Sequence, residues 1–222
     1  MSAFPEMQSH AERILVGAGI LPVVTVDSVQ QAIGTATALL AGGLTAIELT
    51  LRTPASLDAL SALKEQFPGI AVGAGTVLKA AQVEAVCAIG VDFIITPGVS
   101  PALLDVLLAA NVPVIPGAAT PSELMALDAS GFRVAKLFPA AVVGGIGMLK
   151  ALQGPLPHMK LCPTGGIEED NAAEYLAQPN VACIGGSWMV PKAWLQSGAY
   201  DQVTESAARA AAIIRRTRRQ PC

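Results

Sequence analysis

A lysine stands in the middle of a short apolar segment that predicts a β-strand. Within the segment, residues 132 to 141 (FRVAKLFPAA), Pro139 closes the predicted strand. Alternation along a strand places Lys136 on the same face as Val134 and Phe138. Burial disfavours the charged form of a lysine, and an uncharged amine attacks a carbonyl carbon to form a Schiff base. The alternative is a structural lysine at a sheet edge whose amine reaches water past its apolar neighbours.

Polar residues alternate with apolar ones in a second predicted strand, residues 46 to 52 (AIELTLR). Glu48, Thr50 and Arg52 share one of its faces. A carboxylate and a guanidinium at the mouth of a cavity supply a general base and a clamp for an anion. The alternative is a structural ion pair between Glu48 and Arg52, since such pairs also occur without catalysis.

Elimination among the charged residues favours the same two side chains. Lys136 is the only lysine placed mid-to-late in a predicted strand, and Glu48 is the only carboxylate within one. The remaining lysines fall on predicted helices or their starts, in a loop, or at the beginning of a strand: Lys64, Lys79, Lys150, Lys160 and Lys192.

Small polar residues and glycines follow several predicted strands. Thr76, Thr96-Pro97 and Thr164 fall at strand ends, where a threonine can bind a carboxylate or serve only the fold. Two glycine pairs close the last two strands, Gly165-Gly166 and Gly185-Gly186, the second followed by Ser187. Glycine lets a ligand approach backbone N–H groups closely, so two such pairs favour a phosphate site over two tight turns.

Strand and helix patterns alternate eight times along the chain, as expected of βα units. The strands are apolar on both faces, as buried parallel strands are. They are predicted at residues 20–26, 46–52, 71–77, 93–97, 113–117, 132–138, 160–165 and 181–185. This pattern predicts an α/β fold, a single (β/α)₈ TIM barrel spanning residues 1–222, with an N-terminal helix in 1–19 and a C-terminal helix and tail in 200–222.

An open doubly wound sheet is the rival fold. It usually carries a glycine-rich dinucleotide-binding turn after its first strand, and neither that turn nor a Walker motif occurs in the sequence. In a barrel, the reactive groups lie at the carboxyl ends of the strands and in the loops that follow. The polar strand ends described above therefore gather at one rim.

The composition excludes several classes of protein. The net charge of −3 gives no basic field for nucleic acid, and no apolar run is long enough to cross a membrane. The first residues do not form a signal peptide. The four cysteines, Cys87, Cys162, Cys183 and Cys222, show no CxxC spacing, which indicates reduced thiols in the cytoplasm. The only two histidines, His10 and His158, are isolated, which argues against a metal site. The arginines at 215, 216, 218 and 219 predict a solvated helix end.

Six segments together resemble the 2-keto-3-deoxy-6-phosphogluconate (KDPG) aldolase family, class I lyases built on a (β/α)₈ barrel. They are IELTLRT at 47–53, GAGTV at 73–77, TPG at 96–98, KLFPA at 136–140, CPTGGI at 162–167 and CIGGSW at 183–188. The resemblance implies that Lys136 forms the Schiff base and Glu48 is the acid and base. It also implies substrate-binding residues: Arg52, Thr76 and Pro97 at the pyruvate end, Phe138 and Thr164 in the site, and Gly165, Gly166, Gly186 and Ser187 at the phosphate.

The same resemblance implies the partners of the protein. They are a phosphorylated keto acid and pyruvate, with no metal or other cofactor, in a cytoplasmic homotrimer of the Entner–Doudoroff pathway. Cleavage of 4-hydroxy-2-oxoglutarate is expected as a second activity. Alternatives are a galactonate-series aldolase, a metal-dependent aldolase or other phosphosugar enzyme, and a non-catalytic barrel that binds a phosphorylated sugar acid.

Overall fold

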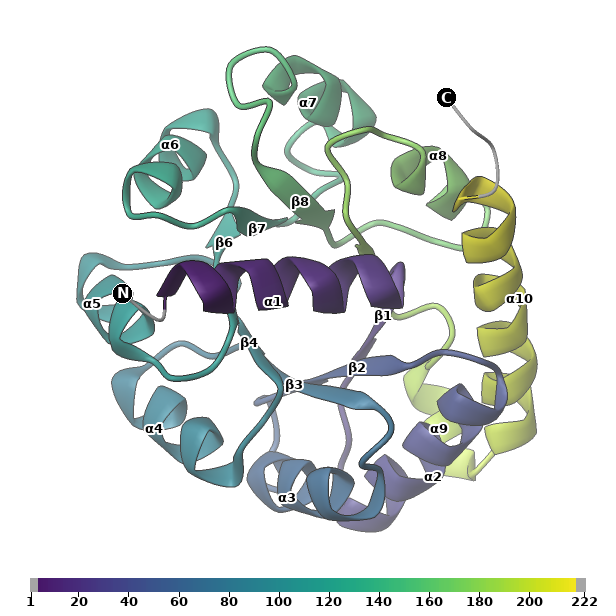
Figure 1. Ribbon diagram of the computed structural model, residues 1–222. Helices are drawn as coiled ribbons and strands as arrows, with labels where there is room; N and C mark the ends of the chain where they lie inside the picture. Colours follow the sequence, from purple (N-terminus) through teal and green to yellow (C-terminus); the bar gives the residue numbers. More distant parts are fainter. Residues whose placement is uncertain (1–3, 219–222) are drawn as a thin grey trace.

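The computed structural model describes residues 4–218, in which short parallel strands at the centre are surrounded by helices (Figure 1). The strands of this part of the chain are β1 (Ile20–Val24), β2 (Ala46–Thr50), β3 (Ala71–Gly75), β4 (Phe93–Ile95), β5 (Val114–Ile115), β6 (Gly117–Ala118), β7 (Val134–Leu137), β8 (Lys160–Pro163) and β9 (Ile184–Gly186). Its helices are α1 (Phe4–Ala18), α2 (Val29–Ala41), α3 (Ser56–Gln66), α4 (Ala80–Ile89), α5 (Pro101–Ala109), α6 (Pro121–Ala129), α7 (Gly145–Leu152), α8 (Ala172–Leu176), α9 (Lys192–Ser197) and α10 (Tyr200–Arg218).

The strands form a curled parallel sheet in two parts. Six strands follow the order β5-β4-β3-β2-β1-β9, and three follow the order β6-β7-β8. All of their pairings are parallel, and β2 and β3 are in register from Ala46 opposite Ala71 to Thr50 opposite Gly75. The chain therefore has the predicted α/β fold, with the carboxyl ends of the strands along one edge.

Helix starts follow the capping residues in the sequence. Ser28, Ser100 and Thr120 each accept a hydrogen bond from the backbone N–H three residues further along. The Glu123 side chain also accepts from the backbone N–H of Thr120, which completes a capping box. These local signals set where α2, α5 and α6 begin.

The predicted strand at 113–117 is divided in the structure. Pro116 separates β5 from β6 because proline has no backbone N–H to donate to a ladder. Its carbonyl still accepts from the backbone N–H of Lys136 at 2.8 Å. Helix α9 begins at Lys192, where the sequence left open a loop or a helix start, and α8 begins at Ala172, directly after the Glu169-Asp170-Asn171 run that predicts its start.

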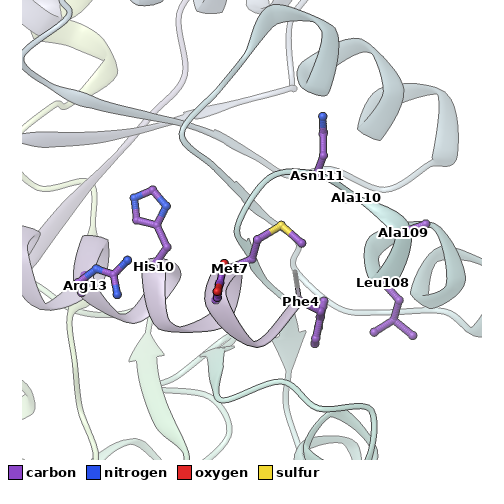
Figure 2. A pocket seen from close by; sticks show the side chains of 9 residues that line it. Phe4, Met7, His10, Arg13, Leu108, Ala109, Ala110 and Asn111 are labelled. Carbon is purple, nitrogen blue, oxygen red and sulfur yellow. The ribbon is translucent and has the colours of Figure 1, made fainter. Parts of the chain in front are cut away.

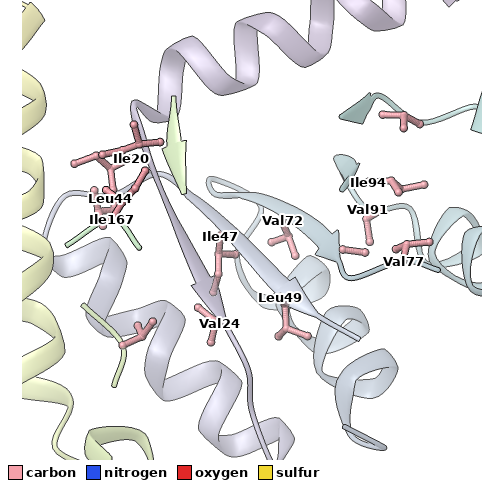
Figure 3. Packing of buried hydrophobic residues seen from close by; sticks show 14 of the residues in the cluster. Ile20, Val24, Leu44, Ile47, Leu49, Val72, Val77, Val91, Ile94 and Ile167 are labelled. Atoms are coloured by element: carbon pink, nitrogen blue, oxygen red, sulfur yellow. The ribbon is translucent and has the colours of Figure 1, made fainter. Parts of the chain in front are cut away.

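Two layers of apolar side chains hold the fold together. Ile47, Leu49 and Val72 belong to the larger cluster, which lies between the strands and the surrounding helices (Figure 3). A second cluster lies inside the curl, where Leu15 of α1 packs with Phe93 and Val134. Helix α1 crosses this end of the sheet (Figure 1), and its Gln8 donates to the carbonyl of Val114. The amino ends of the strands are therefore closed by a helix.

Three cysteines of the described chain are free thiols: Cys87, Cys162 and Cys183. Burial is the main reason that the pKa of Cys183 is raised well above its ordinary value, and it also raises the pKa of Cys87. Cys222 and Arg219 lie outside the described residues.

The end of α10 is more than a solvated helix end, because Arg218 donates hydrogen bonds to the carbonyls of Val16 and Ala182. None of the helices within residues 4–218 combines the length and apolar character that crossing a membrane requires.

Candidate active site

Lys136 and Glu48 meet inside the curled sheet. The Lys136 Nζ lies 3.0 Å from Oε1 and 3.3 Å from Oε2 of Glu48. Their relative exposures are 5% and 1%, so both charged side chains are buried. Charged residues are rarely buried without a partner. This contact excludes the structural alternative of a lysine reaching water.

Strand alternation aims the lysine at the glutamate. Its neighbours Ala135 and Leu137 face the helix-covered core, whereas Val134 packs in the inner cluster two residues before Lys136. The ring of Phe138 lies 5.4 Å from the lysine nitrogen and faces the same cavity. The aromatic face therefore gives the cation further support on that side.

Arg52 is held beside the pair without contacting Glu48. Its Nε donates to the Thr76 hydroxyl at 3.2 Å, and the predicted alternative of a Glu48–Arg52 ion pair does not occur. Thr76 adopts a φ of +59°, a left-handed conformation that is unusual for a β-branched residue. Such backbone strain often occurs at functional sites. The loop after Arg52 is tied back by the Thr53 hydroxyl, which donates to the carbonyl of Val26 at 2.6 Å.

A cavity of about 150 Å³ opens beside the lysine and brings together most of the predicted site residues. Its lining comprises Val23, Arg52, Lys136, Phe138, Thr164, Gly165, Gly166, Ile167, Glu168, Gly185, Gly186 and Ser187. Glu48 and Thr76 reach this group through their contacts with Lys136 and Arg52. Pro97 does not line the cavity; its backbone lies against Gly117, the strand partner of Lys136.

Backbone donors face one end of this cavity. Gly165 and Gly166 have φ values of +98° and +75°, which favour glycine at both positions. Within the described chain, the N–H groups of Gly165, Gly166 and Ser187 donate no hydrogen bond to protein atoms. Free N–H groups in a glycine-rich loop suit an anion such as phosphate.

A second hollow of about 380 Å³ continues outward from the first and shares Val23, Arg52 and Ser187 with it. Lys192 lines this outer hollow, together with Thr25 and Asp27. Sequence reasoning set Lys192 aside because it follows a proline outside any strand. The sequence signal for Lys192 as a binding residue was its position five residues after Ser187, which was predicted to bind the phosphate.

A larger hollow lies elsewhere. It measures about 630 Å³ and runs between α1 and the end of α5, with His10, Arg13 and Asn111 on its wall (Figure 2). These three side chains are exposed. The buried lysine–glutamate pair, not volume, therefore identifies the reactive site. Among the described residues, no three His, Cys, Asp or Glu side chains cluster in a way that would hold a metal ion.

A buried amine beside a carboxylate, at the carboxyl edge of a parallel sheet, is the arrangement of enzymes that attack carbonyl groups through a lysine. Residues 11–206 match the family model of KDPG and KHG aldolases. The chain belongs to this family, which confirms the resemblance inferred from its motifs.

Individual relatives agree with this assignment. The chain is 48% identical to the 2-dehydro-3-deoxy-phosphogluconate aldolase of Pseudomonas aeruginosa over 84% of either chain. It is 42% identical to the KHG/KDPG aldolase of Escherichia coli K12, over 90% of this chain and 94% of that one. A crystal structure of the KDPG aldolase of Legionella pneumophila holds pyruvate as a covalent carbinolamine intermediate; it matches with a TM-score of 0.87 and 42% identity, over 89% of this chain and 96% of that one.

Proposed function

We propose that this protein is a class I aldolase that cleaves 2-dehydro-3-deoxy-6-phosphogluconate to pyruvate and glyceraldehyde 3-phosphate. The observation that carries the proposal is the buried contact of 3.0 Å between Lys136 and Glu48 beside a cavity with anion-binding groups. The names of the relatives from Pseudomonas aeruginosa and Escherichia coli, and the pyruvate adduct in the Legionella pneumophila enzyme, support the same reaction.

The reaction begins when the Lys136 amine attacks C2 of the keto acid. Glu48 lies within hydrogen-bond distance and takes the proton that the amine loses. The carbinolamine then loses water and leaves a protonated imine, which accepts electrons from the neighbouring C3–C4 bond.

Glu48 next removes the proton of the C4 hydroxyl, and the C3–C4 bond breaks. The aldehyde product leaves, and the bonding electron pair stays on C3 as an enamine. Protonation of C3 and hydrolysis of the imine release pyruvate and restore the amine. The same carboxylate thus moves protons in both halves of the reaction.

The remaining site residues hold the two anionic ends of the substrate. Arg52, backed by Thr76, binds the pyruvyl carboxylate through its guanidinium. Phe138 and Thr164 line the middle of the cavity. The free N–H groups of Gly165, Gly166 and Ser187, with Gly186 beside them, bind the phosphate, and Lys192 adds a cation at the outer rim.

The sheet is proposed to close into one (β/α)₈ barrel domain. The β5 and β6 strands flank Pro116 and act as a single strand in this arrangement. Isolated bridges from Leu161 to Val181 and from Thr164 to Gly185 support a junction between β8 and β9. A homotrimer and a cytoplasmic location, the second favoured by the free thiols, complete the proposal.

Borohydride reduction tests the proposed Schiff base. Treating the protein with pyruvate and borohydride should add a stable adduct at Lys136, read by peptide mass. Lys64, which pairs with Asp92 at 2.7 Å outside the cavity, is the internal control and should stay unmodified. An active preparation whose Lys136 remains unmodified would reject the mechanism.

A coupled assay tests the choice of substrate. Pyruvate release from the gluconate and galactonate epimers and from 4-hydroxy-2-oxoglutarate is followed through lactate dehydrogenase. We expect the gluconate epimer to be cleaved with the highest kcat/KM and 4-hydroxy-2-oxoglutarate more slowly. A preference for the galactonate epimer would show that the protein is a galactonate-series aldolase. Binding of all three compounds without cleavage would indicate a non-catalytic barrel.

A further inference from the structure

A glycine lies directly against the carboxylate of Glu48. Gly75 ends β3 and is the register partner of Thr50 on β2. A β-carbon at residue 75 would lie 2.3 Å from Glu48 Oε1, 2.5 Å from its Cγ and 2.8 Å from its Cδ. Real β-carbons do not approach other atoms so closely, so no side chain fits at residue 75 while Glu48 keeps its position.

The backbone does not explain why this residue is a glycine. Gly75 is absent from the residues with positive φ, so its conformation is open to any amino acid. Glycine within a strand weakens it and often marks a close approach by other atoms. The close approach here is that of the Glu48 side chain.

We propose that Gly75 is a positioning residue for Glu48. The space left by its missing side chain is where the carboxylate lies, and this space lets Glu48 reach Lys136 across the sheet. The inference rests on the proposed function, in which Glu48 moves the protons, and it adds a residue on the neighbouring strand that sets where that carboxylate lies.

Neither strand can yield easily to a larger residue. The carbonyl of Gly75 accepts from the backbone N–H of Leu51 at 2.8 Å, and the β2–β3 ladder is continuous over five residue pairs. Glu48 is only 1% exposed, so its carboxylate has no route to solvent that keeps its contact with Lys136. A methyl group at residue 75 therefore pushes the carboxylate away from the amine.

The Gly75→Ala variant tests this inference. We expect kcat for cleavage to fall by about 10- to 1,000-fold, because a displaced general base loses part of its contribution. KM should stay within about threefold, because the groups that bind the carboxylate and the phosphate are not displaced. The pH dependence of kcat should also change, which a purely structural defect would not cause. Gly69→Ala is the matched control, since a β-carbon there meets nothing within 4 Å.

A double-mutant cycle with Glu48→Ala decides whether Gly75 acts through Glu48. Truncation of Glu48 removes the atoms that residue 75 would strike, so Gly75→Ala should then change neither the residual rate nor the midpoint of thermal unfolding appreciably. This comparison also applies if the Gly75→Ala single variant fails to fold, because the double variant is compared with Glu48→Ala alone and should unfold at the same temperature.

The outcomes separate the two proposals. A Gly75→Ala variant with wild-type kcat, or equal losses with and without the Glu48 side chain, would overturn the positioning role while the aldolase activity stands. Failure of the wild-type protein to cleave the substrate would reject the proposed function itself.

Discussion

The two ends of the curled sheet use the same alternation of side chains for opposite purposes. At the amino ends, Leu15 of α1 packs with Phe93 and Val134 in a closed apolar layer. At the carboxyl ends, a buried ion pair faces a cavity of about 150 Å³. Along β7 the change occurs between Val134 and Lys136, two residues that point inward about 6.6 Å apart along the strand.

This difference explains why burial alone does not reveal a site. Val134 and Lys136 are both buried, at 0% and 5% exposure, but only the lysine needs a partner to remain there. Apolar packing at one end supplies stability, and under the proposed function the paired charges at the other end supply reactivity. Changes at the amino end should therefore affect stability, and changes at the carboxyl end should affect rate.

The largest effect is expected at Lys136. Lys136→Arg keeps a cation beside Glu48 but has no amine that can form an imine, so cleavage should fall to the uncatalysed background. Lys136→Met should lose activity equally. Circular dichroism checks that both variants fold, and measurable turnover by either folded variant would contradict the central role of the lysine.

At the opposite end, Leu15→Ala should lower the free energy of unfolding by about 2–5 kcal/mol, because it opens a cavity in a fully buried layer. Its kcat, measured per folded molecule well below the unfolding transition, should match the wild-type value. Val16→Ala on the same helix, where the side chain is 45% exposed, is the control and should change stability little. A large loss of kcat in Leu15→Ala would mean that the two ends are coupled.

A smaller effect is expected at the rim of the cavity. Lys192→Gln should raise KM for the phosphorylated substrate by about 3- to 10-fold, since it removes an exposed charge from the phosphate end. KM for 4-hydroxy-2-oxoglutarate, which has no phosphate, should not change. Lys79→Gln removes the same charge from an exposed position that lines neither hollow, and both KM values should stay unchanged. Equal effects of the two variants would remove Lys192 from the phosphate end.

The smallest effect concerns Glu123 in the first turn of α6, which does not line the cavity beside Lys136. A hydrogen bond from the Ala119 backbone N–H is the main reason that the pKa of Glu123 is lowered from its ordinary value of 4.5. The stabilisation is therefore present above that value and is lost as the pH falls through the lower pKa of the folded state. Glu123→Gln should cost less than about 1 kcal/mol at pH 7, because the group is exposed, and less again at pH 3, where part of the stabilisation has been lost. Denaturant unfolding at pH 7 and pH 3 measures the loss in free energy of unfolding. An equal loss at both pH values would show that the charge of Glu123 is not its source.

Much of the fold follows from local patterns. The starts of α2, α5 and α6 at Ser28, Ser100 and Thr120 depend on hydrogen bonds that each span only three residues, so they belong to the local sequence. The split at Pro116 was missed, and the sequence left open whether Lys192 begins a helix, as it does in α9, or lies in a loop. A proline can end a strand or merely interrupt it, and that choice depends on which neighbouring strand accepts its carbonyl.

Part of the candidate site could also be predicted from local sequence patterns. Lys136 and Glu48 were recognisable as charged residues inside apolar strands, and the motifs named the family. Sequence reasoning expected Lys136 to lie near the acidic and guanidinium groups of the second strand, and the contact of Lys136 with Glu48 confirms this for the carboxylate. It left open a structural pair between Glu48 and Arg52, which the structure does not contain. The role of Gly75 also depends on a contact with a side chain of another strand.

By itself, the sequence determined the order of strands and helices, the inward face of each strand and the family to which the chain belongs. These properties arise from neighbours a few residues apart and from the two-residue period of a strand. Only the tertiary structure decided that Lys136 meets Glu48, 88 residues away along the chain, and that Arg52 turns to Thr76. Such contacts depend on the curl and register of the whole sheet, which no single segment specifies.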